Sequence, residues 1–157
     1  MSFADFALHP LVLQPLEAEG YAAPTPVQAA AIPAALAGRD VLATAQTGTG
    51  KTAAFLLPAL SRIAADARPA LPSAPRVLVL APTRELAMQV AQAARKHARF
   101  LRLNIAEIVG GTPYRVQLNA LARPVDIVVA TPGRLIDHLE RGRLDLGMVE
   151  TLSLIHI

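Results

Sequence analysis

The amino-acid sequence predicts an α/β fold built around a mainly parallel sheet that helices cover on both faces. Short runs rich in Val, Ile and Leu alternate with longer stretches in which Ala and Leu recur at helical spacing. The central runs, RVLVLA and VDIVVA, are apolar almost throughout, as expected for strands buried on two faces. Strands that alternate with helices are joined by crossovers, and such strands run parallel.

Local signals place the elements in order along the chain. Thr25 suits the cap of a first helix, Pro26 suits its first turn and Gly38 suits its end. Three prolines within residues 66–75 mark a surface loop. Strands are expected at residues 40–45, 76–81, 103–109, 125–130 and 149–154. Helices are expected near residues 26–37, 51–65, 84–99, 113–122 and 133–141.

The composition bounds the class of protein. A chain of 157 residues suffices for one domain with a buried core, and the absence of cysteine excludes disulfides and thiolate metal sites. A net charge of +3 permits contact with a polyanion but does not demonstrate it. The N-terminal MSFADFALHP has no secretory signal, and the apolar runs are too short to span a bilayer. We therefore expect a soluble, cytoplasmic, monomeric protein without membrane contacts.

The stretch AQTGTGKT lies between an expected strand and an expected helix, the context that a phosphate-binding loop needs. Gly48 and Gly50 would let the backbone turn so that its N–H groups converge on phosphate oxygens. The helix N-terminus adds a partial positive charge. Lys51 would reach the outer phosphates, and the Thr52 hydroxyl would bind Mg²⁺. The loop residues are Ala45, Gln46, Thr47, Gly48, Thr49, Gly50, Lys51 and Thr52.

One residue departs from the general pattern of such loops, because Ala45 stands where glycine is usual. A string of this kind arises by chance in roughly one chain in a hundred of this size. An accidental glycine turn is therefore the alternative, but the position between strand and helix favours nucleotide binding. The loop by itself identifies neither the nucleotide nor its purpose.

Four further motifs accompany the loop: GYAAPTPVQ (20–28), PTRELA (82–87), GG (110–111) and TPGR (131–134). In this order and at these spacings they closely resemble the first RecA-like domain of DEAD-box RNA helicases, from Phe3 to about Leu152. The resemblance implies a three-layer RecA-like P-loop NTPase domain, incomplete at its C-terminal end. It also implies an adenine-recognition segment (Q motif) at 1–38, a partial N-terminal helicase domain at 39–152, and a non-native tail at 153–157.

The resemblance implies that the nucleotide is ATP. In that family a glutamine placed like Gln28 reads the adenine edge, because an amide donates and accepts at once. A phenylalanine placed like Phe3 stacks on the base, and Tyr21 and Thr25 belong to the same nucleotide-binding segment. The alternative is that Phe3 anchors the N-terminus in a core groove and Gln28 caps a helix. The phosphate loop further along the chain favours adenine.

The family's PTRELA, GG and TPGR segments grip a single RNA strand by its sugar-phosphate backbone. Arg84 and Arg134 offer forked donors for phosphate, and the threonines offer hydroxyls at strand-to-helix turns. Such contacts do not read sequence, so RNA binding is expected to be unspecific and salt-sensitive. Each motif taken alone could be an ordinary turn before a helix. The implied RNA contacts are Pro82, Thr83, Arg84, Gly110, Gly111, Thr131, Pro132, Gly133 and Arg134.

In the family, the strand equivalent to VETL runs into an Asp-Glu-Ala-Asp segment that holds Mg²⁺ and activates the attacking water. Ile155 and His156 occupy the places of its first two acids. Isoleucine cannot bind a hard cation, which needs oxygen ligands, and neutral histidine is a poor replacement for a carboxylate. The second RecA-like domain, with its arginine fingers, is also absent from this chain. By itself, the chain is expected neither to hydrolyse ATP nor to unwind RNA.

Three functions stay open on this basis. The first is the ATP- and RNA-binding part of an RNA helicase, in which the parent protein couples ATP hydrolysis to duplex unwinding. The second is a non-catalytic truncation that binds nucleotide or RNA without hydrolysis. The third is a P-loop ATPase that does not act on RNA, but this function gives no reason for PTRELA and TPGR.

Overall fold

A computed structural model describes residues 1–66 and 68–155, and the chain divides into two compact units. The first unit comprises Met1–Ala67 with Ala93–Arg102, and the second comprises Arg68–Gln92 with Leu103–Ile157. Helix α4 (Arg84–His97) begins in the second unit and ends in the first. Within the described residues, none of the helices combines the length and the apolar character needed to cross a membrane.

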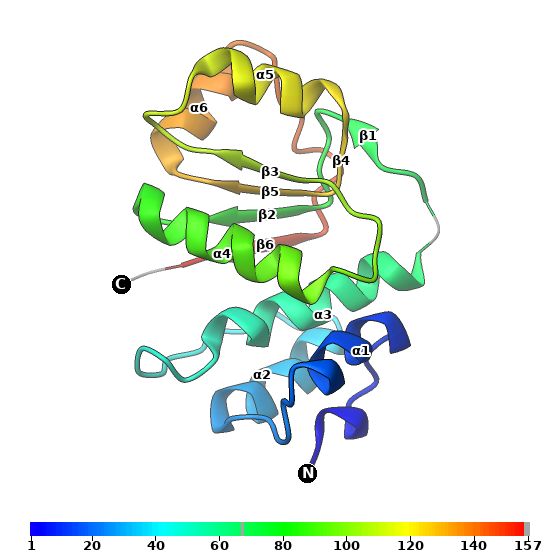
Figure 1. Cartoon of the computed structure of the whole chain (residues 1–157). Helices are drawn as coiled ribbons and strands as arrows, with labels where there is room; N and C mark the ends of the chain where they lie inside the picture. Colours follow the sequence, from blue (N-terminus) through cyan, green and yellow to red (C-terminus); the bar gives the residue numbers. More distant parts are fainter. Residues whose placement is uncertain (67, 156–157) are drawn as a thin grey trace. The chain divides into compact units, whose positions relative to one another are not determined.

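The first unit is helical and is built around α3 (Lys51–Ala65), which contacts two other helices, α1 (Pro10–Ala18) and α2 (Pro26–Leu36). A short 3₁₀ helix, η1 (Phe3–Asp5), precedes them (Figure 1). Burial of aliphatic side chains from all three α-helices holds this unit together. The fully buried ones are Val12, Leu16, Ile32, Leu56, Leu57 and Leu60.

Polar contacts with α3 fix the ends of its neighbours. The Arg62 guanidinium donates to the Ala35 carbonyl, at 3.1 Å, in the last turn of α2, and the Gly38 N–H donates to the same carbonyl at 3.0 Å. The Ser61 hydroxyl accepts a hydrogen bond from the backbone N–H of His9, at 2.9 Å, just before α1. Helix α3 therefore both follows the phosphate loop and forms hydrogen bonds to the start of α1 and the end of α2.

The second unit contains a four-stranded parallel sheet with the order β3–β5–β2–β6. Two further short strands, β1 and β4, pair antiparallel with each other. The sheet strands are β2 (Val77–Leu80), β3 (Ile105–Ile108), β5 (Ile127–Ala130) and β6 (Thr151–Leu154), and the short pair is β1 (Leu71–Pro72) and β4 (Pro124–Val125). The strands pair in register, so that β2, β3 and β5 all end at the same level, at Leu80, Ile108 and Ala130.

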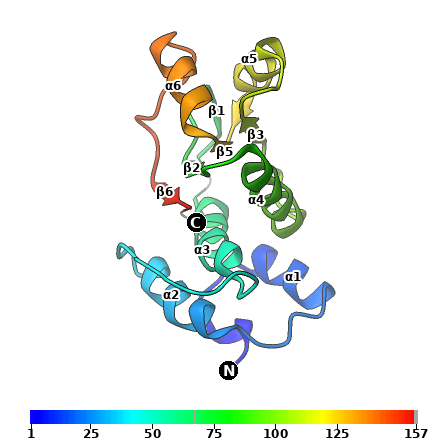
Figure 2. The ribbon, with the colours of Figure 1, turned by 90° about the vertical axis from the view of Figure 1, so that its left-hand side faces the viewer.

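Helices α5 (Tyr114–Ala122) and α6 (Pro132–Glu140) pack on one face of this sheet (Figures 1 and 2). Alternate strand residues point to the same face, and here they join apolar residues of both helices and of the segment that follows α6. This core comprises Leu78, Ala106, Ile108, Leu121, Val125, Val128, Ala130, Leu135 and Leu144. The intervening strand residues Val77, Val79, Ile127 and Val129 are also fully buried, as predicted for a sheet covered on both faces.

The predicted α/β class with a parallel sheet is confirmed, as are all five predicted helices, within two residues or fewer at their ends. Four of the five predicted strands are confirmed with shorter bounds, as β2, β3, β5 and β6. The sequence reading missed η1 and α1. It also assigned residues 66–75 entirely to a loop, although Leu71–Pro72 form β1.

The strand predicted at residues 40–45 is wrong, because these residues form neither strand nor helix. Leu42 is 96% exposed and Val41 is 45% exposed. An apolar run becomes a strand only where a neighbouring strand pairs with its N–H and C=O groups. Among the described residues, no strand pairs with this segment.

Candidate functional site

The phosphate loop turns into α3 through two glycines in the left-handed region. Gly48 has φ of 81° and Gly50 has φ of 86°, and Gly50 caps α3, which begins at Lys51. Lys51 is exposed, and the first N–H groups of α3 lack intrahelical acceptors, as in every helix. This arrangement suits a phosphate group, because a glycine turn, a helix N-terminus and the exposed Lys51 side chain follow one another directly.

The Gln28 side chain joins the start of α2 to this loop. Its Oε1 accepts from the Thr25 backbone N–H at 3.0 Å, and its Nε2 donates to the Gly50 carbonyl at 3.2 Å. A Cβ at position 50 would overlap Gln28 Nε2, so only glycine leaves room for this contact. The Thr25 hydroxyl is buried beside it and has no hydrogen-bond partner among the described residues.

The capping role that the sequence left as an alternative for Gln28 is therefore present in the structure. This capping role uses only half of the hydrogen-bonding capacity of the Gln28 amide. The oxygen and the nitrogen of a glutamine amide can each make two hydrogen bonds, and each makes one here. Within the described part of the chain one N–H and one lone pair of the amide remain, which is the combination that an adenine edge requires. Gln28 is only 3% exposed, however, so burial rather than bonding capacity limits its access to a base.

Phe3 lies in an aromatic cluster with Phe6 and Tyr21. Its ring meets both edge-on, with centroids 6.1 Å from Phe6 and 6.3 Å from Tyr21, and it is only 4% exposed. Tyr21 is 40% exposed and lies 5.5 Å from the Lys96 ammonium. In this arrangement Phe3 anchors the N-terminal segment, and Tyr21 presents the more accessible ring.

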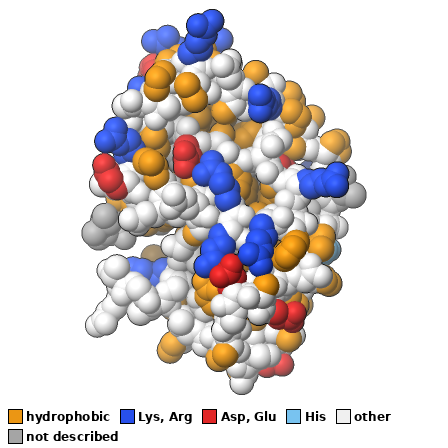
Figure 3. All heavy atoms as spheres, in the orientation of Figure 1, with side chains coloured by type: hydrophobic (Ala, Val, Ile, Leu, Met, Phe, Trp, Pro, Cys, Tyr) orange, Lys and Arg blue, Asp and Glu red, His pale blue; other side chains and the backbone are white. Residues whose placement is uncertain are grey.

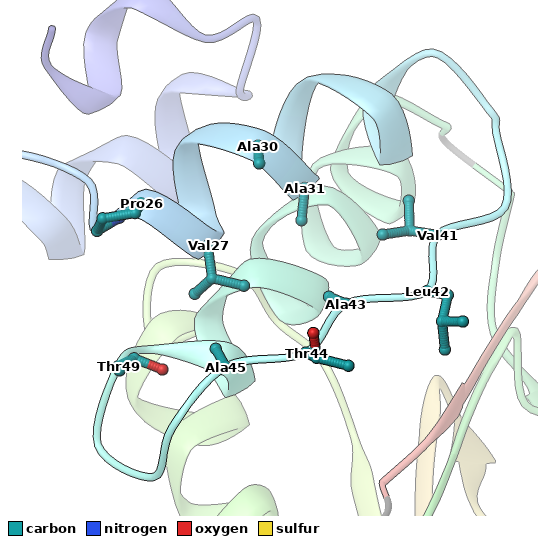
Figure 4. A pocket seen from close by; sticks show the side chains of 10 residues that line it. All are labelled: Pro26, Val27, Ala30, Ala31, Val41, Leu42, Ala43, Thr44, Ala45 and Thr49. Atoms are coloured by element: carbon teal, nitrogen blue, oxygen red, sulfur yellow. The ribbon is translucent and has the colours of Figure 1, made fainter.

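An apolar hollow of about 550 Å³ lies between α2 and the segment that leads into the phosphate loop (Figure 4). Val27 and Ala31 of α2 face this segment, whereas Leu42 points away from the helix. The hollow is lined by Pro26, Val27, Ala30, Ala31, Val41, Leu42, Ala43, Thr44, Ala45 and Thr49. Its lining is methyl-rich and uncharged, so it offers apolar contact beside the loop and no charge for a phosphate.

The three motifs predicted to bind RNA form three neighbouring turns in the second unit. PTRELA follows β2, GG follows β3 and TPGR follows β5, and these strands end at the same level of the sheet. Thr83 and Thr131 each precede a helix, and the Thr83 hydroxyl accepts from the Leu86 N–H at 3.2 Å. The structure thus brings residues far apart in the sequence to one edge of the sheet.

Arg84 lies directly against Gly111, where a Cβ would overlap its Nη1. Gly111 also has φ of 84°, so position 111 needs glycine for its backbone conformation as well as for space. The Arg84 side chain is half exposed and lies 3.6 Å from Glu85, a surface pair of little energetic weight. Its guanidinium is therefore accessible beside the glycine turn.

Arg134 is fixed to the same turn by backbone and side-chain acceptors. Its Nη1 donates to the Thr112 carbonyl at 3.0 Å and to Gln117 Oε1 at 3.1 Å. Both bonds are made by Nη1. The N–H groups of Nη2 and Nε make no hydrogen bond to any described residue. Arg134 is half-buried, with the Tyr114 ring centroid 5.6 Å from its guanidinium carbon.

Sequence reasoning missed the side chains that surround Arg134. Gln117 is 1% exposed, and its Nε2 donates to the Val109 carbonyl at 2.7 Å. His138 is completely buried, and its ring stacks on Tyr114 with centroids 4.3 Å apart. A polar residue one turn before the buried Leu121, on the apolar face of an amphipathic helix, was the available signal for Gln117.

Burial lowers the pKa of His138 below its ordinary value of 6.5, and the positive charge of Arg134 lowers it further. Asp137 acts in the opposite direction, while Arg141 and Arg143 add to the lowering. The Nε2 atom of His138 lies 2.8 Å from Gln117 Oε1. His138 therefore belongs to the network as a neutral side chain.

The residues after β6 do not form a cation site in the described chain. Ile155 continues the sheet, with its N–H donating to the Leu80 carbonyl at 2.9 Å, and has no oxygen in its side chain. His156 lies outside the described residues. Among the residues described, no group of three or more His, Cys, Asp or Glu side chains is placed to hold a metal.

Charge is not concentrated on the face of the protein shown in Figure 3. Lys and Arg side chains stand there in small separate groups, with acidic side chains among them. The face shown therefore carries no continuous basic patch.

Comparison with a solved structure identifies the class of protein. The crystal structure of a hypothetical ATP-dependent RNA helicase from Sulfolobus tokodaii matches with a TM-score of 0.82 and 38% identity, over 94% of this chain and 41% of that chain. The family model for DEAD/DEAH box helicases matches residues 25–155. The chain therefore belongs to the DEAD/DEAH box helicase family.

Curated relatives agree with this assignment. ATP-dependent RNA helicase DeaD of Mycobacterium tuberculosis (strain ATCC 25618 / H37Rv) is 52% identical over 98% of this chain and 26% of its own length. DeaD of Escherichia coli (strain K12) is 50% identical over 98% of this chain and 24% of its own length. ATP-dependent RNA helicase SrmB of Haemophilus influenzae is 51% identical over 96% of this chain and 34% of its own length. The chain thus spans about a quarter to a third of these relatives.

The buried, neutral state of His138 predicts acid sensitivity. The pKa of His138 lies below 6.5 in the folded chain, so as the pH falls below about 6.5 the unfolded chain takes up a proton that the folded chain does not. The free energy of unfolding therefore decreases on acidification. In His138→Phe, which can keep the stack on Tyr114, the decrease should be smaller by up to about 1 kcal/mol per pH unit.

Urea unfolding of both proteins at several pH values between neutral and mildly acid conditions measures this difference. His97, whose pKa is also lowered mainly by burial, is present in both proteins and cancels in the comparison. An equal loss of stability on acidification in the two proteins would contradict the assignment of His138 as neutral.

Proposed function

We propose that this chain binds ATP with Mg²⁺ through the first unit and the backbone of single-stranded RNA through the second. In the whole protein, ATP hydrolysis is then coupled to unwinding of RNA duplexes. One observation carries the RNA part: the ends of three adjacent strands place Arg84 against Gly111 and Arg134 against Thr112. The names of the helicase relatives support the same conclusion.

On the nucleotide side, residues 45–52 hold the phosphates. The N–H groups that follow the left-handed Gly48 and Gly50 donate to phosphate oxygens, and Lys51 neutralises the outer phosphates. The Thr52 hydroxyl is a ligand for Mg²⁺, which prefers oxygen. Bound ATP·Mg²⁺ supplies the phosphoryl group and the charge neutralisation. Gln28 and Tyr21 lie on the side of the base, with Phe3 supporting Tyr21.

On the RNA side, the guanidinium groups of Arg84 and Arg134 bind phosphates, assisted by the hydroxyls and N–H groups of the flanking turns. Gly110, Gly111 and Gly133 let the strand approach the backbone closely. Contacts of this type position RNA without reading its sequence. Pro82 lies in the turn after β2 and Pro132 is the first residue of α6, and Thr83 and Thr131 directly precede the two helices.

We further propose the division into an adenine-recognition segment at 1–38, a partial helicase domain at 39–152 and a non-native tail at 153–157. Ile155 stands directly after β6, where the family has its Mg²⁺-binding aspartate, and provides no oxygen ligand. The chain by itself is therefore inactive as an ATPase. This residue also favours a second candidate function, a module that binds nucleotide or RNA without hydrolysis.

Replacing Lys51 by alanine should weaken binding of a fluorescent ATP analogue by about tenfold or more. The reason is the loss of a charged hydrogen bond to phosphate. Fluorescence titration measures the affinity. An exposed cation outside the loop supplies the control, because Arg102 belongs neither to the loop nor to the adenine-recognition segment. Arg102→Ala should leave the affinity unchanged, and an unchanged affinity in Lys51→Ala would refute the loop assignment.

Replacing Arg134 by alanine should weaken binding of a labelled single-stranded RNA and flatten its salt dependence by about one phosphate contact. Fluorescence anisotropy across a series of salt concentrations measures both quantities. Arg123→Ala is the matched control, because Arg123 is exposed and precedes β5 at the opposite edge of the sheet. If Arg134→Ala keeps the wild-type salt slope, Arg134 does not bind phosphate.

The chain should release no phosphate from ATP above background in the presence of Mg²⁺ and RNA, because the acids that bind the metal and activate water are absent. A coupled phosphate assay on the purified chain tests this expectation. Sustained turnover that RNA stimulates would contradict it and would also remove the non-hydrolysing module as a candidate.

A further inference from the structure

We propose that Gln117 is a positioning residue for RNA binding, which holds the Arg134 guanidinium against the glycine turn that follows β3. The proposal rests on the RNA-binding function proposed above, and it adds a residue outside the three motifs. Gln117 has no access to RNA itself, since it is 1% exposed on the inner face of α5. Its effect must therefore pass through the groups that it contacts.

The Gln117 amide connects the ends of two neighbouring strands. Its Nε2 donates to the carbonyl of Val109, the residue before Gly110, at 2.7 Å. Its Oε1 accepts from Arg134 Nη1 at 3.1 Å, and the same nitrogen donates to the Thr112 carbonyl, on the other side of the glycine pair, at 3.0 Å. Gln117 and Arg134 thus bracket the turn between Val109 and Thr112.

The donors and acceptors of this network are determined by its members. The Val109 carbonyl can only accept, so the amide nitrogen of Gln117 must face it and the amide oxygen must face Arg134. His138 Nε2, 2.8 Å from the same oxygen, must then carry a hydrogen and donate. The lowered pKa of His138 agrees with a neutral ring in this tautomer.

Glutamate, methionine and asparagine cannot make both of these contacts at position 117. Glutamate has no N–H to donate to Val109, methionine has nearly the same length but makes neither bond, and asparagine is one methylene shorter. The amide is 1% exposed and His138 Nε2 lies 2.8 Å from its oxygen, so no large displacement is open to it. The position therefore demands a group that both donates and accepts at a fixed length.

Fixing Arg134 before RNA arrives makes binding tighter. A free arginine side chain loses rotamer freedom when it binds a phosphate, whereas a guanidinium already bonded at Nη1 loses less. Its Nη2 and Nε atoms stay available for a phosphate. Without the Gln117 acceptor, Thr112 is the remaining hydrogen-bond partner of Arg134 among the described residues, and the turn loses its connection to α5.

The test uses the 157-residue chain with a short fluorescein-labelled oligouridine, whose binding is followed by anisotropy at several salt concentrations. We expect Gln117→Met to weaken RNA binding by about tenfold, in line with the loss of a hydrogen bond to a charged group. It should also flatten the salt dependence as Arg134→Ala does. Binding of a fluorescent ATP analogue should not change. Asn119→Ala, an exposed position on the same helix, is the control and should behave as wild type.

A double variant separates positioning from a general structural role. If Gln117 acts through Arg134, then adding Gln117→Met to Arg134→Ala should cause little further loss of RNA affinity. Additive losses would overturn the proposal, and so would wild-type affinity in Gln117→Met. Failure of the wild-type chain to bind the oligouridine would instead refute the proposed function itself.

Thermal unfolding checks that each variant is folded. Should Gln117→Met fail this check, Gln117→Asn retains an amide that is too short to reach Val109 and Arg134 together, and it should give the same loss of affinity and of salt slope. If neither variant folds, Gln117 is a folding residue and the proposal is wrong.

Discussion

The in-register pairing of β2, β5 and β3 is the constraint on which the second unit depends. Because Leu80, Ala130 and Ile108 lie side by side in one ladder, the residues that follow them must leave the sheet at the same edge. The ladder continues one residue further at two places, where Ala81 N–H donates to the Ala130 carbonyl and Thr131 N–H to the Ile108 carbonyl. A register shift of one residue would separate the motif turns and invert the faces of the core.

Both units use a glycine in the left-handed region to admit a polar side chain from another motif. Gly50 leaves room for the Gln28 amide, and Gly111 leaves room for the Arg84 guanidinium. In each case a Cβ would overlap the side-chain nitrogen and would also strain the backbone. These glycines therefore do more than permit a turn. They determine which side chain lies against the loop, and each joins two segments that are distant in the sequence.

The sequence was sufficient to predict the elements whose signals are local. Thr25, Pro26 and Gly38 bounded α2 correctly, and apolar runs identified four strands, because caps, breakers and buried strands depend on nearby residues. Residues 40–45 carry the same local signal but pair with no strand, and pairing is a property of the fold. The sequence did not predict a role for Gln117 for a similar reason. Its partners Val109, Arg134 and His138 come from other elements, so only the assembled sheet shows that its amide is satisfied.

The proposed RNA site at Arg134 and the proposed adenine site at Gln28 differ in how far the protein must rearrange to admit a ligand. Arg134 is half-buried and already oriented, and no hydrogen bond among the described residues uses its Nη2 or Nε. A phosphate at the proposed RNA site would therefore add bonds without breaking any. Gln28 also keeps one donor and one acceptor position, but it is 3% exposed and lies against Gly50 and Thr25. A base can reach it only if those neighbours move. Because Gln28 and the phosphate loop share the Gly50 carbonyl contact, such a movement cannot leave the loop unchanged. In the proposed nucleotide site, recognition of the base and the conformation of the loop would for this reason form one coupled equilibrium.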